Sequence, residues 1–312
     1  MFQKNVSLKS LSNYKIGGNA EYFFEANGIR GLVQAVIKAR ERKLPVFILG
    51  GGTNLLIDDA GFSGLVLKPN FNRIDIDDVE LRVGAGVLIE SVLDVTISKK
   101  LRGLEWAGGL PGTLGGAIRG NAGAFGGEIK DSIKEVVSLD ISGAIPKIRR
   151  RNSKECDFGY RSSIFKSCGN KEIILEASLI FSLGDKNLIR ASIEEKINYR
   201  KERHPMEYPN IGSIFKNVDV SAVSENVLKN IPLAAIKSDP FPVIPAAYLI
   251  SKTGIKGVSF GGAMISPKHP NFIVNVLDAK SSHVESLITL AKEEVKNKFN
   301  IVLEEEVVRL RG

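Results

Sequence analysis

The most constraining feature of the sequence is a glycine-rich segment at residues 108–128, GGLPGTLGGAIRGNAGAFGGE, which holds nine glycines in 21 residues. Glycine adopts backbone conformations that other residues avoid, and it lets another group approach the main chain closely. Ordering a loop with so many glycines costs more conformational entropy than ordering an ordinary loop. The segment therefore indicates either close internal packing or the approach of a ligand to the backbone.

A second glycine cluster, ILGGGTNLLI, lies at residues 48–57 and directly follows the apolar run VFIL, which predicts a buried strand. A dinucleotide fingerprint would need a glycine at Leu55 and a helix there, whereas LLI is typical of a strand. A Walker loop is also disfavoured, because neither cluster ends in Gly-Lys-Ser/Thr. Consecutive amides can still cradle an anion, and Thr53 and Asn54 add donors. One cluster alone would more often serve turns or packing, but the two together favour a ligand with a long diphosphate.

Length and composition limit the class of protein. A chain of 312 residues exceeds one ordinary core, so two or three domains are expected, and 43% hydrophobic with 25% charged residues is typical of globular domains. No apolar run approaches the roughly 20 residues of a membrane span, and the first residues lack the apolar stretch of a secretory signal. We therefore expect a cytoplasmic protein without membrane insertion. Cys156 and Cys168 match no metal-binding spacing, so we expect reduced thiols and no metal.

The net charge of +8 raises the question of a nucleic-acid partner. The only dense basic run is KIRRR at residues 147–151, which has no interleaved aromatic residues and is more typical of a solvated loop or strand edge. Positive charge spread along the chain suits small anionic ligands equally well. We therefore expect no nucleic acid and a small anionic partner.

Hydrophobic periodicity predicts a mixed α+β chain. The helical patterns begin near Leu32, Ile89, Leu188 and Ala246, and Ser282 with Glu285 forms a capping-box pattern for a last long helix. Strand patterns lie at residues 46–49, 79–83, 135–141, 172–183, 257–266, 271–276 and 301–303. The sequence RHPMEYP predicts a domain boundary near residue 202, because proline cannot continue a helix.

A series of motifs resembles one known family. LGGGTNLLI and GLPGTLGGAIRGNAGAFGGEI are followed by FGYRSSIF, GSIFKN, GGAMISPKHPNFIVN and LEEEV. This order is similar to that of the UDP-N-acetylenolpyruvoylglucosamine reductase (MurB) family of peptidoglycan synthesis, over nearly the whole chain. The compact segment between FGYRSS and GSIFKN resembles the type II branch, which lacks an extra substrate-covering loop. Thr53, Val218 and Pro270 stand where the family more often has Ser, Pro and Ala.

The resemblance implies a fold and a cofactor. Residues 1–201 would form an FAD-binding domain of the vanillyl-alcohol-oxidase (PCMH) type in two subdomains with a break near residue 70. Residues 202–312 would form a smaller α+β substrate-binding domain, whose last strand (about 301–310) returns Glu306 to the flavin site. FAD would be noncovalent, since neither glycine cluster offers a suitable His or Cys. The cofactor-binding residues would be Gly50, Gly51, Gly52, Thr53, Asn54, Leu55, Pro111, Gly112, Thr113, Gly115, Gly116, Asn121, Ala122 and Gly123.

The resemblance also implies a reaction, in which NADPH is the hydride donor and UDP-N-acetylglucosamine enolpyruvate is reduced to UDP-N-acetylmuramate. Arg161 would stabilise charge on the substrate carboxylate, Ser213 would donate a proton to C2, and Glu306 would work beside Arg161. Glu306 is preferred to its acidic neighbours because the family residue directly precedes a Val. The substrate-binding residues would be Tyr160, Lys216, Asn217, His269 and Asn271.

Two other interpretations remain open. The chain could be another FAD oxidase of the same fold, acting on a sugar or hydroxy acid and passing electrons to oxygen. It could also be a noncatalytic nucleotide-binding protein that kept the fold, since an arginine, a serine in a turn and an acidic run each have ordinary structural roles. The sequence assigns no protein partner.

Overall fold

The computed structural model describes residues 1–239 and 241–312, and the chain divides into two compact units. Unit 1 comprises Met1–Val6, Ala20–Gly51 and Phe62–Arg200. Unit 2 comprises Ser7–Asn19, Gly52–Gly61 and Lys201–Gly312. The chain therefore enters unit 2 three times.

Unit 1 contains two main sheets. The first has the strand order β1-β2-β5-β3, and both β2 and β3 pair with β5 in parallel. Helix α1 (Ile29–Glu41) connects β2 to β3 and buries Leu32, Ala35, Val36 and Ala39, as its apolar spacing predicts. The strands are β1 (Gln3–Ser7), β2 (Asn19–Ala26), β3 (Val46–Ile48) and β5 (Phe62–Pro69).

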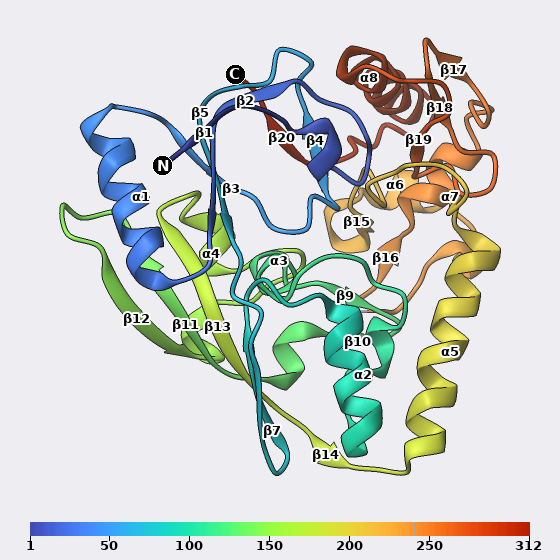
Figure 1. Ribbon diagram of the computed structural model, residues 1–312. Coiled ribbons are helices and arrows are strands. Elements are labelled where there is room, and N and C mark those ends of the chain that lie inside the picture. The colour runs from blue at the N-terminus through green and yellow to red at the C-terminus, as the bar shows by residue number, and fades with distance from the viewer. Residues whose placement is uncertain (240) are drawn as a thin grey trace. The chain divides into compact units, whose positions relative to one another are not determined.

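The second sheet of unit 1 is antiparallel and has the order β12-β11-β13-β7-β6 (Figure 1). Its strands are β6 (Ile74–Asp77), β7 (Glu80–Gly84), β11 (Ile133–Asp140), β12 (Lys147–Asn152) and β13 (Glu172–Ile180). The basic run expected at a solvated edge forms β12, the edge strand, where Arg149 and Arg150 pair with Asp140 and Glu135.

The remaining elements of unit 1 include three that the glycine-rich segment itself forms, namely α3 (Leu114–Gly120) and the short pair β9 (Gly123–Ala124) with β10 (Gly127–Glu128). The others are α2 (Ile89–Lys99), α4 (Ile164–Ser167), α5 (Lys186–Arg203), and the short pair β8 (Leu101–Arg102) with β14 (Ser182–Leu183). Trp106, Leu114 and Ile118 pack with residues of β7, β13 and α5 in one core. The glycine-rich segment is thus part of the folded interior of unit 1.

Unit 2 is built around helix α8 (Ser281–Phe299), which packs against β17 (Ser259–Phe260) and β18 (Ala263–Ile265) (Figure 1). Val284, Leu287, Ile288, Ala291 and Val295 form its buried face. Strand β18 also pairs with β19. The other elements are β4 (Leu55–Ile57), β15 (Val218–Asp219), α6 (Glu225–Leu228), β16 (Val243–Ile244), α7 (Ala246–Ser251), β19 (Ile273–Asn275) and β20 (Val308–Leu310).

Two early segments belong to unit 2, although the sequence prediction placed all of residues 1–201 in the first domain. Tyr14, Ile16 and Leu56 are buried in the core of unit 2. The Tyr14 hydroxyl donates to the carbonyl of Ile273 at 2.8 Å, and the Asn275 amide donates to the carbonyl of Tyr14 at 3.1 Å. These contacts connect residues about 260 positions apart, which local sequence patterns do not reveal.

The C-terminal strand is shorter than predicted. Strand β20 covers only Val308–Leu310 and pairs in parallel with β4, whereas residues 301–307 form no ladder and touch residue 215 through a single bridge at Glu305. The capping-box prediction is also wrong. Asp59 accepts from the N–H and hydroxyl of Ser281 at the start of α8, while Glu285 pairs with Arg309 and Arg311.

No helix within residues 1–239 and 241–312 has both the length and the apolar character that crossing a membrane requires. The same residues contain no group of three or more His, Cys, Asp or Glu side chains placed to hold a metal ion.

Candidate active site

In unit 1 the two glycine clusters lie directly against each other. A Cβ atom at Gly51 would lie 2.8 Å from the Cα of Gly112, and one at Gly50 would lie 3.1 Å from Oγ1 of Thr113. Backbone-to-backbone contact of this kind leaves no room for a side chain. Gly112 also has a φ of 109°, in a region that favours glycine. These glycines are therefore required to bring the two main chains together.

Several other glycines of the segment serve internal packing. A Cβ at Gly108 would lie 2.5 Å from the carbonyl oxygen of Ile193, one at Gly115 would lie 2.9 Å from the Cβ of Ala85, and one at Gly127 would lie 2.3 Å from the indole of Trp106. Gly115 also donates its N–H to the carbonyl of Ala85 at 2.9 Å. By contrast, Cβ atoms at Gly116 and Gly120 would meet nothing closer than 3.5 Å. The internal-packing interpretation thus explains much of the segment, and Gly116 and Gly120 keep an open side.

The main-chain amides of residues 50–54, in the glycine cluster at residues 48–57, donate no hydrogen bond to any described residue. In unit 1, the N–H groups of Gly50 and Gly51 donate no hydrogen bond to any group in the part of the chain that the structure describes. In unit 2 the same is true of the N–H groups of Gly52, Thr53 and Asn54, again counting only described residues. Main-chain amides without a protein partner are the donors that an anion such as a diphosphate accepts from.

Arg161 lies in a tight turn of unit 1. Gly159 and Ser162 exchange backbone hydrogen bonds at 3.1 Å, which places Tyr160 and Arg161 at the tip of a two-residue hairpin. Arg161 has a φ of 53°, a left-handed conformation that is uncommon for a residue with a side chain and is concentrated at functional sites. Its guanidinium donates to the carbonyl of Gly123 at 2.9 Å and lies 5.2 Å from the ring centre of Tyr160.

Buried hydrogen bonds hold this turn against the glycine-rich segment. Asn121 is fully buried, and its amide donates to the carbonyl of Gly159 at 3.0 Å. Ser163 donates to the carbonyl of Arg119 at 2.7 Å, and Lys166 donates to the carbonyl of Arg161 at 2.8 Å. Asn121 therefore supports the Arg161 turn with its side chain. Sequence reasoning missed Lys166, whose only signal is its place just after the FGYRSSIF motif.

In unit 2 the structure brings Ser213 and Glu306 onto neighbouring segments. The N–H of Glu306 donates to the carbonyl of Ile214 at 2.8 Å, and the N–H of Lys216 donates to the carbonyl of Glu304 at 2.9 Å. Asn54 adds a third connection, since its amide donates to the carbonyl of Glu306 at 3.2 Å and its carbonyl accepts from the N–H of Val308 at 3.1 Å. Asn54 therefore links residues 52–57 of unit 2 to the backbone of Glu306.

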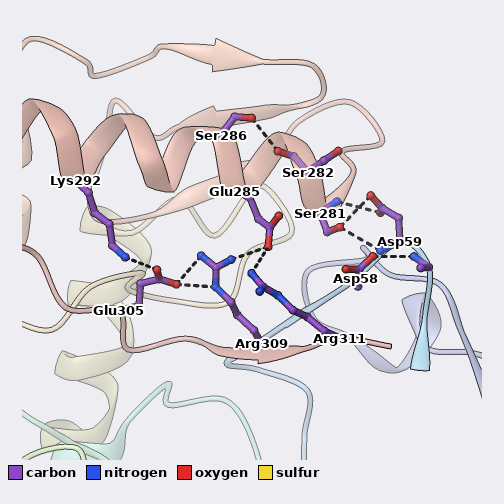
Figure 2. Close-up of polar contacts among 11 residues, drawn as sticks. Asp58, Asp59, Ser281, Ser282, Glu285, Ser286, Lys292, Glu305, Arg309 and Arg311 are labelled. Atoms are coloured by element: carbon purple, nitrogen blue, oxygen red, sulfur yellow. Dashed lines mark hydrogen bonds and ion pairs between the residues drawn. The ribbon is translucent and has the colours of Figure 1, made fainter. Parts of the chain in front are cut away.

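The three consecutive glutamates have different surroundings. Glu304 is exposed and forms an ion pair with Lys216. Glu305 is bound by Lys292 and Arg309 (Figure 2). Glu306 is half-buried, and its carbonyl accepts from the Asn54 amide. The structure therefore separates Glu306 from its acidic neighbours, which the sequence could do only through the family position.

Two of the predicted substrate residues of unit 2, Asn271 and Asn217, form hydrogen bonds with backbone groups of the same unit. Asn271 is buried and uses its side chain to accept from the N–H of Phe215 and donate to its carbonyl, both at 2.9 Å. Asn217 accepts from the N–H of Ala246 at 3.2 Å. Asn271 thus supports residues 213–217 from one side, whereas the predicted role was contact with substrate.

His269 packs in an aromatic group with His204 and Phe272, at ring-centre distances of 5.2 and 4.8 Å. Burial lowers the pKa of His269 to about 4, and the positive charges of Lys237 and Lys256 add to this effect. Its Nδ1 atom is buried and has no hydrogen-bond partner among the described residues. His269 is therefore neutral at neutral pH and belongs to the packing of unit 2.

Comparison with known proteins identifies both parts of the chain. Residues 21–148 match the model of an FAD binding domain, and residues 204–310 match that of the UDP-N-acetylenolpyruvoylglucosamine reductase C-terminal domain. The reductase of Clostridium tetani is 35% identical over 306 residues, covering 97% of this chain and 90% of the relative. That of Prochlorococcus marinus is 34% identical over 308 residues, covering 98% and 96%.

A solved structure agrees with these matches. The crystal structure of UDP-N-acetylenolpyruvylglucosamine reductase (MurB) from Thermus caldophilus has a TM-score of 0.77 and 26% sequence identity, and the alignment covers 100% of both chains. The α+β fold class and the FAD-binding fold predicted from the motifs are thereby confirmed. Since its curated relatives are matched over almost their whole length, the chain belongs to the family of UDP-N-acetylenolpyruvoylglucosamine reductases.

Proposed function

We propose that the protein reduces UDP-N-acetylglucosamine enolpyruvate to UDP-N-acetylmuramate with NADPH as hydride donor, as a cytoplasmic step in peptidoglycan precursor synthesis. The observation that carries this proposal is the backbone pairing of residues 214 and 216 with Glu304 and Glu306, which sets Ser213 and Glu306 on adjacent segments. Family membership favours this reaction over the oxidase and the noncatalytic alternatives.

The glycine clusters fit a noncovalent FAD. Gly51 and Gly112 are in backbone contact, and the N–H groups of residues 50–54 have no acceptor among the described residues, so they suit a diphosphate. FAD, when bound, would supply hydride transfer to the substrate. In this proposal residues 1–201 provide the FAD-binding domain and residues 202–312 the substrate-binding domain. The other FAD-binding residues are those that the motifs assign: Leu55, Pro111, Thr113, Gly115, Gly116, Asn121, Ala122 and Gly123.

The proposed roles of Arg161, Ser213 and Glu306 follow from the charge changes of the reaction. Adding hydride at C3 of the enolpyruvyl group moves negative charge through C2 into the carboxylate, and the reaction ends with a proton on C2. Arg161 would stabilise that charge, because its planar set of donors matches a carboxylate. Ser213 would donate the proton. Glu306 must be protonated or orient a donor, since an additional bare negative charge would raise the barrier.

Substrate binding is proposed for residues near these groups. Lys216, whose side chain is 19% exposed, and Asn217 directly follow the Ser213 segment, and they would contact the UDP-sugar. Tyr160 lies beside Arg161 at the tip of the hairpin and would line the site. His269 and Asn271 would contribute indirectly, by packing and by holding residues 213–217.

A product assay tests the proposal. Purified protein incubated with NADPH and the enolpyruvyl substrate under nitrogen should consume the two in equal amounts and yield a product heavier by two hydrogen atoms, as measured by mass spectrometry. Acid precipitation should release FAD into the supernatant. NADPH consumption that requires oxygen and leaves the UDP-sugar unchanged would contradict the proposal, and so would flavin retained in the pellet.

A further inference from the structure

Glu305 belongs to an ion network that joins helix α8 to the C-terminal segment (Figure 2). Lys292 of α8 donates to one carboxylate oxygen of Glu305. Arg309 donates to the other oxygen, through Nε at 2.9 Å and Nη2 at 2.8 Å. Arg309 also donates to Glu285 of α8 at 2.6 Å, and Arg311 reaches the same carboxylate at 3.1 Å. Residues 305–311 are thus attached to α8 by side chains at two points.

The binding of Glu305 is more specific than an ordinary surface ion pair. Its side chain is only 18% exposed, and Arg309 binds it with two donors of one planar group, which fixes direction as well as distance. Burial by itself would raise the pKa of Glu305, but hydrogen bonds from Lys292 and Arg309 outweigh burial and lower it. Glu305 is therefore ionised and held in one orientation at neutral pH.

The backbone of residues 304–306 is joined to the segment at residues 214–216 by two main-chain hydrogen bonds, from Lys216 to Glu304 and from Glu306 to Ile214. This stretch is outside any ladder, since it has one bridge, between Phe215 and Glu305, and β20 begins only at Val308. Side chains alternate in an extended chain, so a slip of one residue would exchange the directions of Glu305 and Glu306. A carboxylate bound to α8 at residue 305 opposes that slip, because the slip would separate Glu305 from both Lys292 and Arg309.

We propose that Glu305 is a positioning residue for Glu306: its attachment to Lys292 and Arg309 fixes the register of residues 304–307 and thereby the side on which Glu306 is presented. This inference rests on the proposed function, in which Glu306 assists the reduction of the enolpyruvyl group. In this inference Glu306 takes part in the reaction, whereas Glu305 holds the segment in place by binding Lys292 and Arg309.

The test compares the two half-reactions of the holoenzyme by stopped flow. Glu305→Gln removes the charge that holds Arg309 and Lys292, and misplacement of a reacting group by about 1 Å costs up to roughly a hundredfold. Oxidation of the reduced flavin by the enolpyruvyl substrate should therefore slow by roughly ten- to a hundredfold, while flavin reduction by NADPH is unchanged. Glu293→Gln, the same chemical change at an exposed position of α8, is the matched control and should leave both rates unchanged.

A double variant shows whether Glu305 acts through Glu306. If it does, Glu305→Gln/Glu306→Gln should be no slower than Glu306→Gln alone, because nothing remains to be positioned. A further loss in the double variant would overturn the inference. Lys292→Gln removes one arm of the network and keeps the Arg309 pair, so it should slow the same half-reaction in folded protein even if Glu305→Gln folds poorly.

The outcomes separate this inference from the proposed function. If Glu306→Gln slows flavin oxidation but Glu305→Gln and Lys292→Gln do not, the positioning role is wrong and the proposed function stands. If Glu306→Gln has no effect on either half-reaction, the role assigned to Glu306 is wrong, and the positioning role falls with it.

Discussion

Ser213 precedes a segment whose backbone is held from two directions. Asn271 binds both polar backbone groups of Phe215, and the N–H of Glu306 donates to the carbonyl of Ile214. A hydroxyl on such a support keeps its position without being part of a helix or a ladder, as transfer of a proton to a defined carbon requires. This support suits the Ser213 hydroxyl to donate a proton, but it would equally suit a serine that only stabilises a turn.

Ser213→Ala is expected to slow oxidation of the reduced flavin by the enolpyruvyl substrate by roughly a hundred- to ten-thousandfold, the range for loss of a positioned general acid. Flavin reduction by NADPH should stay near normal, because that half-reaction needs no proton at C2. Stopped-flow absorbance of the flavin measures both rates. Ser286→Ala, at a half-buried serine of α8 whose hydroxyl donates to the carbonyl of Ser282, is the control. Equal slowing of both half-reactions would show that Ser213 is structural.

The sequence proposes residues for the site but does not show their surroundings. Arg161, Ser213 and Glu306 follow from motif order, but the left-handed conformation of Arg161 and its contact with Gly123 depend on a hairpin held by Asn121 and Lys166. The role of Asn271 was similarly hidden, because its partner Phe215 lies 56 positions away in the chain. Motif order suggests which residues lie in the site. What each side chain holds in place depends on hydrogen-bond partners that are distant in the sequence.

At the scale of elements, the short helix α3 shows how adjacent glycines differ in purpose. Gly115 donates its N–H to the carbonyl of Ala85, and a Cβ there would overlap the Cβ of Ala85 at 2.9 Å. A Cβ at Gly116 would meet only Oγ1 of Thr113, at an ordinary contact distance of 3.5 Å. One glycine is therefore needed for helix-to-sheet packing, and its neighbour is not.

Gly115→Ala is expected to destabilise the protein by about 1–3 kcal/mol, the usual cost of overpacking, with a lower melting temperature. Gly116→Ala is the matched variant one residue away. It should leave stability unchanged or raise it by up to about 1 kcal/mol, because alanine favours the helix. Thermal unfolding followed by circular dichroism measures both. Equal stability of the two variants would contradict the packing assigned to Gly115.

Long periodic elements were predictable, and so were some short ones, such as β3, expected at residues 46–49, and α7, expected near Ala246. Helices α1, α2 and α5 follow from apolar spacing, and their observed bounds contain the residues that define that spacing, whereas α8 was expected from a capping-box pattern at Ser282. The Ser282 capping box failed because Asp59, from another part of the chain, binds Ser281 instead. The strand expected at residues 301–303 is absent because Ile301 and Leu303 are buried, and Val302 is exposed, without a partner strand in the described structure.

At the scale of the whole molecule, the division into two units was only partly visible in the sequence. The proline-rich boundary lies close to the observed change from Arg200 to Lys201. The two early segments of unit 2 could not be predicted, because Tyr14 and Leu56 resemble any other buried residues until their partners are known. Burial of titratable groups within the units has a consequence for stability that can be measured on the intact protein.

The stability of the protein is expected to fall as the pH decreases from about 6.5 to about 4, because burial lowers the pKa of His269 to about 4. In that window the unfolded chain binds a proton on His269 that the folded chain does not bind, so protonation favours unfolding. Chemical denaturation at several pH values measures the slope. His269→Gln should flatten it, and an unchanged slope would contradict the assignment.

A second pH range, in which Asp140 titrates in place of His269, provides an internal control. Hydrogen bonds from Ser142 and Arg149 lower the pKa of Asp140 to about 2. The stabilisation from this carboxylate is present above its unfolded pKa of about 3.9 and is lost as the pH falls toward 2. Asp140→Asn should therefore change the slope only below about pH 4, where His269→Gln has little further effect.

The most direct test of the proposed function is an anaerobic titration of the purified holoenzyme followed by flavin absorbance. Addition of NADPH should bleach the flavin, and subsequent addition of the enolpyruvyl substrate should restore its colour in proportion to the substrate added, with UDP-N-acetylmuramate as the product. Flavin that stays bleached with the substrate but regains its colour when oxygen is admitted would contradict the account.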